Sequence, residues 1–91
     1  MDKSALLDQA KEFVTKDRNK THGAAEDNFN NVAMLWSCFL DRSIDATEVA
    51  LMMTLFKIAR AKHNRSNPEN WLDGIGYLAC GGEIATKDLS S

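Results

Sequence analysis

The feature that most constrains the fold is the stretch from residue 49 to residue 59, which is apolar on almost every side of a helix. A surface helix keeps a polar face, so a stretch of this kind indicates a helix surrounded by other elements. Asp45 and Glu48 precede it at the spacing of a capping box, in which both side chains engage free backbone N–H groups at the helix start. The sequence therefore predicts a central helix over residues 46–62.

Two earlier segments have the three-and-four spacing of a helix face. The first covers residues 4–16, with Ser4 as its expected N-cap. The second covers residues 24–40, where apolar side chains step by four and three: Ala25, Phe29, Val32, Trp36 and Phe39. Such a narrow seam is typical of helices packed nearly antiparallel. Residues 17–23 contain no aliphatic side chain and predict a loop.

A last helix is predicted to begin at Asn67, Pro68 and Glu69, which supply an N-cap, a proline at the first helical position and an acid in the first turn. Its buried face is expected at Leu72, Ile75 and Ala79. The same helix carries four glycines, at positions 74, 76, 81 and 82. Glycine weakens a helix interior, so the close approach of a backbone or a ligand is expected to compensate. For the glycines at 81 and 82, the end of the helix is an equal alternative.

The overall pattern predicts an all-α fold. No segment alternates polar and apolar residues for long enough to indicate a sheet. A chain of 91 residues encloses one core, so residues 1–91 are expected to form a single domain. We expect a compact bundle of about four helices with the apolar third helix at its centre.

Charge and hydropathy exclude several classes of protein. A net charge of −2 disfavours a nucleic-acid partner, because such binding needs a basic face. The longest strongly apolar run, residues 49–56, is far shorter than the roughly 20 residues that cross a bilayer, and the amino terminus has no export signal. We therefore expect no membrane partner and a cytoplasmic location. A core this small favours homo-oligomerisation.

Two cations interrupt the apolar third helix. Lys57 and Arg60 lie three residues apart on one helix face, and Asn64 extends the line. Cations set among apolar neighbours need compensation, either from an anionic ligand or from protein carboxylates. The first alternative predicts a phosphate site. The second predicts pairing with Asp73 or Glu48 at the bundle surface.

A polar stripe runs along the fourth helix. Asn70, Asp73, Tyr77 and Cys80 are spaced by three, four and three residues. If this stripe faces the basic pair, it would add a carboxylate for a ribose hydroxyl or a divalent metal and an aromatic face for a base. The alternative is a solvated surface stripe.

A third polar cluster lies at the start of the second helix. Lys20, Thr21, His22 and Gly23 precede Glu26 and Asn28. Free N–H groups and the helix dipole make helix starts suitable for anions, and Lys20 and His22 would strengthen such a site. A solvated loop is an equal alternative. Neither histidine has a second ligand at zinc spacing, and no nucleophile or P-loop pattern occurs, so no cofactor is expected.

The order of these motifs resembles a group of small phage and prophage proteins similar to nucleotide-modification-associated domains. The motifs that carry the resemblance are residues 20–23, 26–29, 33–36, 57–60, 70–73 and 76–77. More distantly, the chain is similar to the all-α nucleoside triphosphate pyrophosphohydrolases, whose helices hold magnesium through two acidic pairs. Asp73 matches the last acid of the second pair, whereas Asn70 replaces its glutamate. The first pair is absent, because Lys57 and Arg60 stand there instead, which inverts the charge of such a site.

Three functional hypotheses follow. The first is a protein that binds or sequesters a nucleotide or nucleotide-derived phosphate ligand. Its expected contact residues are Lys57, Arg60, Asp73, Tyr77, Asn70, Trp71, Lys20 and His22. The second is a Mg²⁺-dependent nucleotide pyrophosphohydrolase, with Asp73, Glu69 and Glu26 near the metal. The third is a non-catalytic helical module whose seam residues bind a partner helix or another protomer.

Overall fold

A computed structural model describes residues 1–17 and 25–87, and these ranges form four α-helices and one π-helical turn. The α-helices are α1 (Lys3–Glu12), α3 (Ala25–Leu40), α4 (Ala46–His63) and α5 (Pro68–Ala85). The π-helical turn η1 (Phe13–Asp17) continues α1. These described ranges contain no strand, and the predicted all-α class is confirmed.

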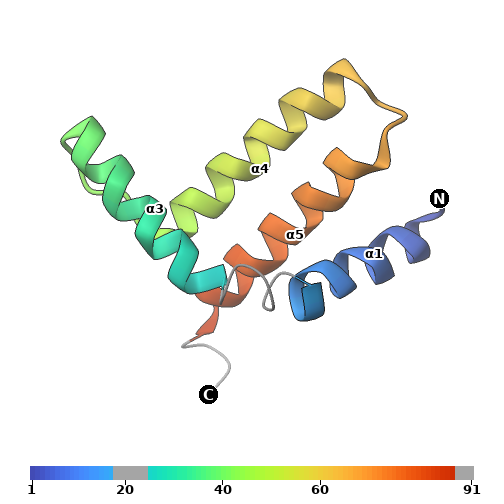
Figure 1. Ribbon diagram of the computed structural model, residues 1–91, viewed down its shortest axis with the longest axis horizontal. Coiled ribbons are helices and arrows are strands. Elements are labelled where there is room, and N and C mark those ends of the chain that lie inside the picture. The colour runs from blue at the N-terminus through green and yellow to red at the C-terminus, as the bar shows by residue number, and fades with distance from the viewer. Residues whose placement is uncertain (18–24, 88–91) are drawn as a thin grey trace.

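The helices are arranged around an antiparallel pair formed by α4 and α5 (Figure 1). α1 lies along the side of α5 that faces away from α4, and α3 crosses the start of α4. α5 contacts α1, η1, α3 and α4, whereas α4 contacts α3 and α5. None of the described helices is both long enough and apolar enough to cross a bilayer.

Two caps explain where the paired helices begin. The carboxylate of Asp45 accepts a hydrogen bond from the Glu48 N–H (2.8 Å), and the Glu48 side chain accepts one from the Asp45 N–H (3.0 Å), which confirms the predicted capping box. The hydrogen bonds that the Asp45 carboxylate accepts, first from the Glu48 N–H and next from the Thr47 hydroxyl, favour its ionised form and lower the pKa of Asp45 from 3.8. The Asn67 side chain accepts from the Glu69 N–H (3.0 Å) at the start of α5, as predicted.

The predicted cap of the first helix is wrong. Asp2, not Ser4, is the N-cap, because its carboxylate accepts a hydrogen bond from the Ala5 N–H at 2.8 Å. Ser4 lies inside α1. Since Asp and Ser cap helices about equally well, the choice between two such residues so close together depends on where the backbone turns.

A tight turn links α3 to α4. Asp41 has a φ of 54°, and the Arg42 N–H donates to the Ser37 carbonyl (3.2 Å), which together form a left-handed helix stop. The Ser37 hydroxyl accepts from the Ile44 N–H (2.8 Å) and so ties the end of this turn back to α3. The turn fixes how α3 crosses α4.

The core lies where α3, α4 and α5 meet. Phe29, Ala33, Ala46, Val49 and Ala50 are buried there. Small side chains allow a close approach of α4 and α5: a Cβ atom built on buried Gly81 would lie 2.6 Å from the Cβ of Ala50. α5 continues past Gly81 and Gly82 to Ala85, so at Gly81 the close approach, rather than the end of the helix, is the explanation.

The described part of the chain leaves much of the apolar stretch of α4 exposed. Val49 and Ala50 are 1% exposed, but several large side chains of the same helix remain exposed. These are Leu51, Met52, Leu55, Phe56 and Ile58. The apolar seam predicted for residues 24–40 also ends early. Phe39 of α3 is exposed, although Phe29 is buried. Among residues 1–17 and 25–87, neighbours therefore cover only one side of α4.

Candidate functional site

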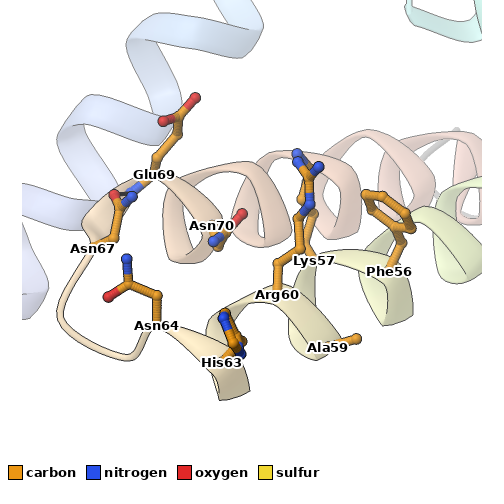
Figure 2. A pocket seen from close by; sticks show the side chains of 9 residues that line it. All are labelled: Phe56, Lys57, Ala59, Arg60, His63, Asn64, Asn67, Glu69 and Asn70. Carbon is orange, nitrogen blue, oxygen red and sulfur yellow. Dashed lines mark hydrogen bonds between the residues drawn. The ribbon is translucent and has the colours of Figure 1, made fainter.

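A pocket lies beside the half of the α4–α5 pair that is joined by residues 64–67 (Figure 2). Its volume is about 470 Å³, within the range of small-molecule sites. The last turns of α4, the connecting loop and the first turn of α5 supply its walls. The lining residues are Phe56, Lys57, Ala59, Arg60, His63, Asn64, Asn67, Glu69 and Asn70. We call this the polar pocket.

Arg60 and Phe56 form one wall of the polar pocket. The two residues are one helical turn apart on α4, and the Arg60 guanidinium carbon lies 4.9 Å from the centre of the Phe56 ring. Within residues 1–17 and 25–87, no carboxylate forms an ion pair with Arg60. Its charge is therefore oriented by the ring while its donors stay available to the pocket.

Lys57 is held differently from Arg60. Its ammonium group forms an ion pair with the Asp73 carboxylate of α5, at 3.0 Å. The side chain of Lys57 is 13% exposed and that of Asp73 is 32% exposed, so the pair is partly shielded from water. Of the two cations, Lys57 meets the acid of α5, as the protein-carboxylate alternative predicted, whereas Arg60 forms no ion pair with it.

The start of α5 adds amides and a helix dipole to the polar pocket. Asn67 caps the helix, and Asn64 and Asn70 line the same pocket (Figure 2). The unsatisfied N–H groups of a helix start favour an anion. Glu69 is the one carboxylate among the described lining residues, and it opposes that preference in part.

Two of the other predicted contact residues, Tyr77 and Trp71, do not line the polar pocket. Tyr77 packs on the core, with its ring centre 6.1 Å from that of Phe29, and it does not line the polar pocket. Trp71 donates its indole N–H to the Arg65 carbonyl (3.0 Å). Lys20 and His22 lie outside the described residues. The described residues that were expected to line one cavity therefore lie in different places. Tyr77 packs against the core, Trp71 lies beside Arg65, and Arg60 lines the polar pocket.

Trp71 belongs to a second, mainly apolar pocket between the same two helices. This apolar groove has a volume of about 470 Å³. Its lining is Thr54, Lys57, Ile58, Ala61, Lys62, Arg65, Asn70, Trp71, Gly74, Ile75 and Leu78. Lys57 and Asn70 line both pockets, so they mark the boundary between a polar and an apolar surface.

The acids of the magnesium hypothesis do not come together in the described ranges. Glu26 pairs with Lys87 at 2.6 Å, Asp73 pairs with Lys57, and Glu69 lines the polar pocket. Across residues 1–17 and 25–87, no three side chains of the His, Cys, Asp or Glu type are grouped as metal ligands. The described residues thus supply isolated carboxylates rather than the paired acids of such a centre.

Comparison with known proteins places the chain in a family. Residues 5–85 match the model of a domain of unknown function, DUF6378. The chain belongs to the DUF6378 family. The "Gene 55 protein" of Mycobacterium phage D29 is 34% identical over 76 residues, covering 84% of this chain and 50% of that protein. The protein of the same name from Mycobacterium phage L5 is 33% identical over 75 residues, covering 80% and 47%.

The comparisons confirm the resemblance to phage proteins. The DUF6378 chain spans about half the length of the curated relatives that it matches. No solved structure matches it. The similarity to nucleotide-modification-associated domains and to pyrophosphohydrolases stays a prediction.

Sequence reasoning missed several residues that line the polar pocket of this DUF6378 chain. Phe56 was treated as part of the apolar helix, and His63 and Asn67 as a loop residue and a cap. A signal for Phe56 was present, because it stands four residues before Arg60 and an aromatic side chain at that spacing can receive a guanidinium. His63 could not be assigned to a pocket from the sequence, because that requires knowing where the start of α5 lies relative to the end of α4.

Proposed function

We propose that this chain binds a nucleotide or a nucleotide-derived phosphate ligand in the polar pocket between α4 and α5. The observation that carries the proposal is the Arg60 guanidinium, which lines the pocket beside the Phe56 ring and has no ion-pair partner among the described residues. Arginine suits phosphate because its planar donors bind two oxygens at once. Binding of this kind, including sequestration of the ligand, needs no catalytic group.

The remaining lining residues fit the other parts of such a ligand. The Phe56 ring is 50% exposed and offers a face on which a base can stack. Asn64 and Asn70 carry both donors and acceptors, which suit the edges of a base or the hydroxyls of a sugar. In this proposal Phe56, Asn64 and Asn70 contact the base and sugar, in place of Tyr77 and Trp71.

Lys57 and Asp73 have a supporting role in this proposal. Their 3.0 Å ion pair fixes the distance between α4 and α5 at the edge of the polar pocket. Lys57 still lines the pocket, so its charge adds to the field at a bound phosphate. Asp73 then orients Lys57 instead of binding a ribose or a metal.

A thermal-shift series over inorganic phosphate and mono-, di- and cyclic nucleotides tests the proposal, with and without Mg²⁺. A ligand at 100 times its Kd adds about 2.7 kcal/mol, which in a domain of this size raises Tm by roughly 10 to 20 °C. Arg60→Ala should abolish the shift. Arg42→Ala is the matched control, because Arg42 is an exposed arginine in the α3–α4 turn and does not line the pocket.

The outcomes separate clearly. A shift in wild type and in Arg42→Ala that disappears in Arg60→Ala supports the proposal. A shift that survives Arg60→Ala places the ligand elsewhere, and no shift with any of these compounds contradicts a nucleotide or phosphate ligand.

A further inference from the structure

The single chain exposes more surface than a protein of its mass usually does. Its accessible surface is 6695 Å², whereas a monomeric protein of 10.1 kDa exposes roughly 5,300 Å². The difference exceeds the roughly 800 Å² that each partner contributes to a standard protein interface. The excess surface is therefore large enough for a second molecule to cover.

Four exposed apolar side chains lie together on one face of α4. Leu51 is 55% exposed, Leu55 is 64% exposed and Ile58 is 57% exposed, and they follow one another in steps of four and three. Met52, 40% exposed, lies beside them. In Figure 1 this helix is at the edge of the molecule, with α5 along only one of its sides. We call Leu51, Met52, Leu55 and Ile58 the outer face of α4.

We propose that a second copy of this chain packs on the outer face of α4, with the two α4 helices antiparallel about a two-fold axis near Leu55. Steps of four and three are the pattern by which helices pack nearly parallel or antiparallel along a shared seam. In the antiparallel register Leu55 meets the partner's Leu55, and Met52 meets the partner's Ile58. One apolar face then covers its own copy, as a two-fold interface requires.

The charges at the ends of the outer face select the antiparallel arrangement. Glu48 precedes Leu55 by seven residues and Lys62 follows it by seven, so both share its side of the helix. Both are exposed, and the capping hydrogen bond of Glu48 uses one of its two carboxylate oxygens. Antiparallel packing places Lys62 beside the partner's Glu48 at both ends, whereas parallel packing would place like charges together.

This self-complementarity favours a second copy over an unrelated partner. An apolar stripe with opposite charges at equal distances from its centre matches itself after a two-fold rotation. The resulting dimer would contain α4 and α5 twice, a four-helix arrangement that buries the apolar stretch on both sides. The proposal does not depend on a ligand in the polar pocket.

The test is the mass of the 91-residue chain in solution, measured by light scattering and by sedimentation over a concentration series. Wild type should have at least twice the chain mass of 10.1 kDa. Leu55→Glu should weaken self-association by at least about a hundredfold, because two carboxylates would face one another across the axis. Leu7→Glu on α1 is the matched control, since Leu7 is 59% exposed but lies on another helix.

A second pair of variants tests the register. Lys62→Glu should weaken the dimer roughly tenfold by placing two acids together at each end. Adding Glu48→Gln should restore most of the affinity, because glutamine removes the repulsion and still serves in a capping box. Circular dichroism confirms that each variant keeps its helices.

Two results would overturn the proposal. The first is a wild-type chain that stays monomeric up to about 1 mM, the Kd of a very weak complex. The second is a dimer that Leu55→Glu leaves intact, whether or not Leu7→Glu dissociates it. Absence of any effect of Lys62→Glu on a dimer that Leu55→Glu breaks would contradict the antiparallel register.

Discussion

The two ends of the α4–α5 interface differ in side-chain size: small residues form one end, and long polar residues form the other. Near the start of α4, Ala50 and Gly81 bring the helices into such close contact that a methyl group on Gly81 would overlap Ala50. We call this the glycine end. Toward residues 64–67 the interface is formed by long polar side chains, with Lys57 reaching Asp73. We call this the loop end.

The difference shows how side-chain size decides where this molecule can form a site. At the glycine end small residues leave no room between the helices, and Val49 nearby is 1% exposed. At the loop end the side chains are long and charged, and pockets form on both sides of Lys57. Stability is therefore expected to depend mainly on the glycine end, and the proposed ligand binding on the loop end.

Two phenylalanines give the largest test of this division. Phe29, 3% exposed, packs into the core at the glycine end, so Phe29→Ala should lower the free energy of unfolding by about 3 to 5 kcal/mol. Phe56 is 50% exposed at the loop end, so Phe56→Ala should lower the free energy of unfolding by about 1 kcal/mol or less. Urea unfolding measures both. Equal losses would contradict the division.

The two adjacent glycines of α5 provide a test of opposite signs. Alanine usually stabilises a helix relative to glycine by about 1 kcal/mol. At Gly81 the added Cβ would lie 2.6 Å from the Ala50 Cβ, so Gly81→Ala should instead cost about 1 to 3 kcal/mol.

Gly82→Ala is the matched control, because a Cβ there meets nothing within 4 Å. It should stabilise the chain by about 0.5 to 1 kcal/mol. Thermal unfolding of the two variants side by side should give shifts of opposite direction. A gain in Tm for both would mean that α4 and α5 are not in close contact at this point.

Sequence patterns predicted those parts of the fold that depend on neighbouring residues. The Asp45–Glu48 capping box and the Asn67 cap are confirmed, because a cap involves residues within one turn. The face shared by Lys57 and Arg60 follows from helix geometry alone, and both residues line the polar pocket.

What the sequence could not give is the rotation of each helix against its neighbours. Asn70, Asp73 and Tyr77 were grouped as one stripe, yet Asn70 lines the polar pocket, Asp73 binds Lys57 and Tyr77 packs near Phe29. The contact between Ala50 and Gly81 sets the spacing and register of the two helices, and it joins residues far apart in the chain. Spacing within one helix carries no information about such a contact.

A smaller effect is expected from breaking the ion pair at the loop end. Asp73→Ala leaves the Lys57 ammonium, on a side chain that is 13% exposed, without its partner, and should cost about 1 to 2 kcal/mol. Lys57→Met should cost less, because Asp73 is 32% exposed and remains partly hydrated. Urea unfolding at low and high salt measures both. A larger loss for Lys57→Met would mean that the two sides of the pair are shielded in the opposite order.

The smallest effect concerns the two caps, which differ in charge although they have the same function. Asp45 caps α4 at the glycine end as an ionised acid, and Asn67 caps α5 at the loop end as a neutral amide. The pKa of Asp45 is lowered from 3.8 in the folded chain, so its ionised form stabilises the fold above that pH. This contribution is lost as the pH falls through the lowered pKa.

Asp45→Asn keeps a good cap but removes the charge. The stability difference between wild type and Asp45→Asn should therefore favour wild type at neutral pH and shrink below pH 3.8. Urea midpoints at several pH values measure this difference directly, and a difference that does not change with pH would show that the carboxylate acts at the cap without its charge.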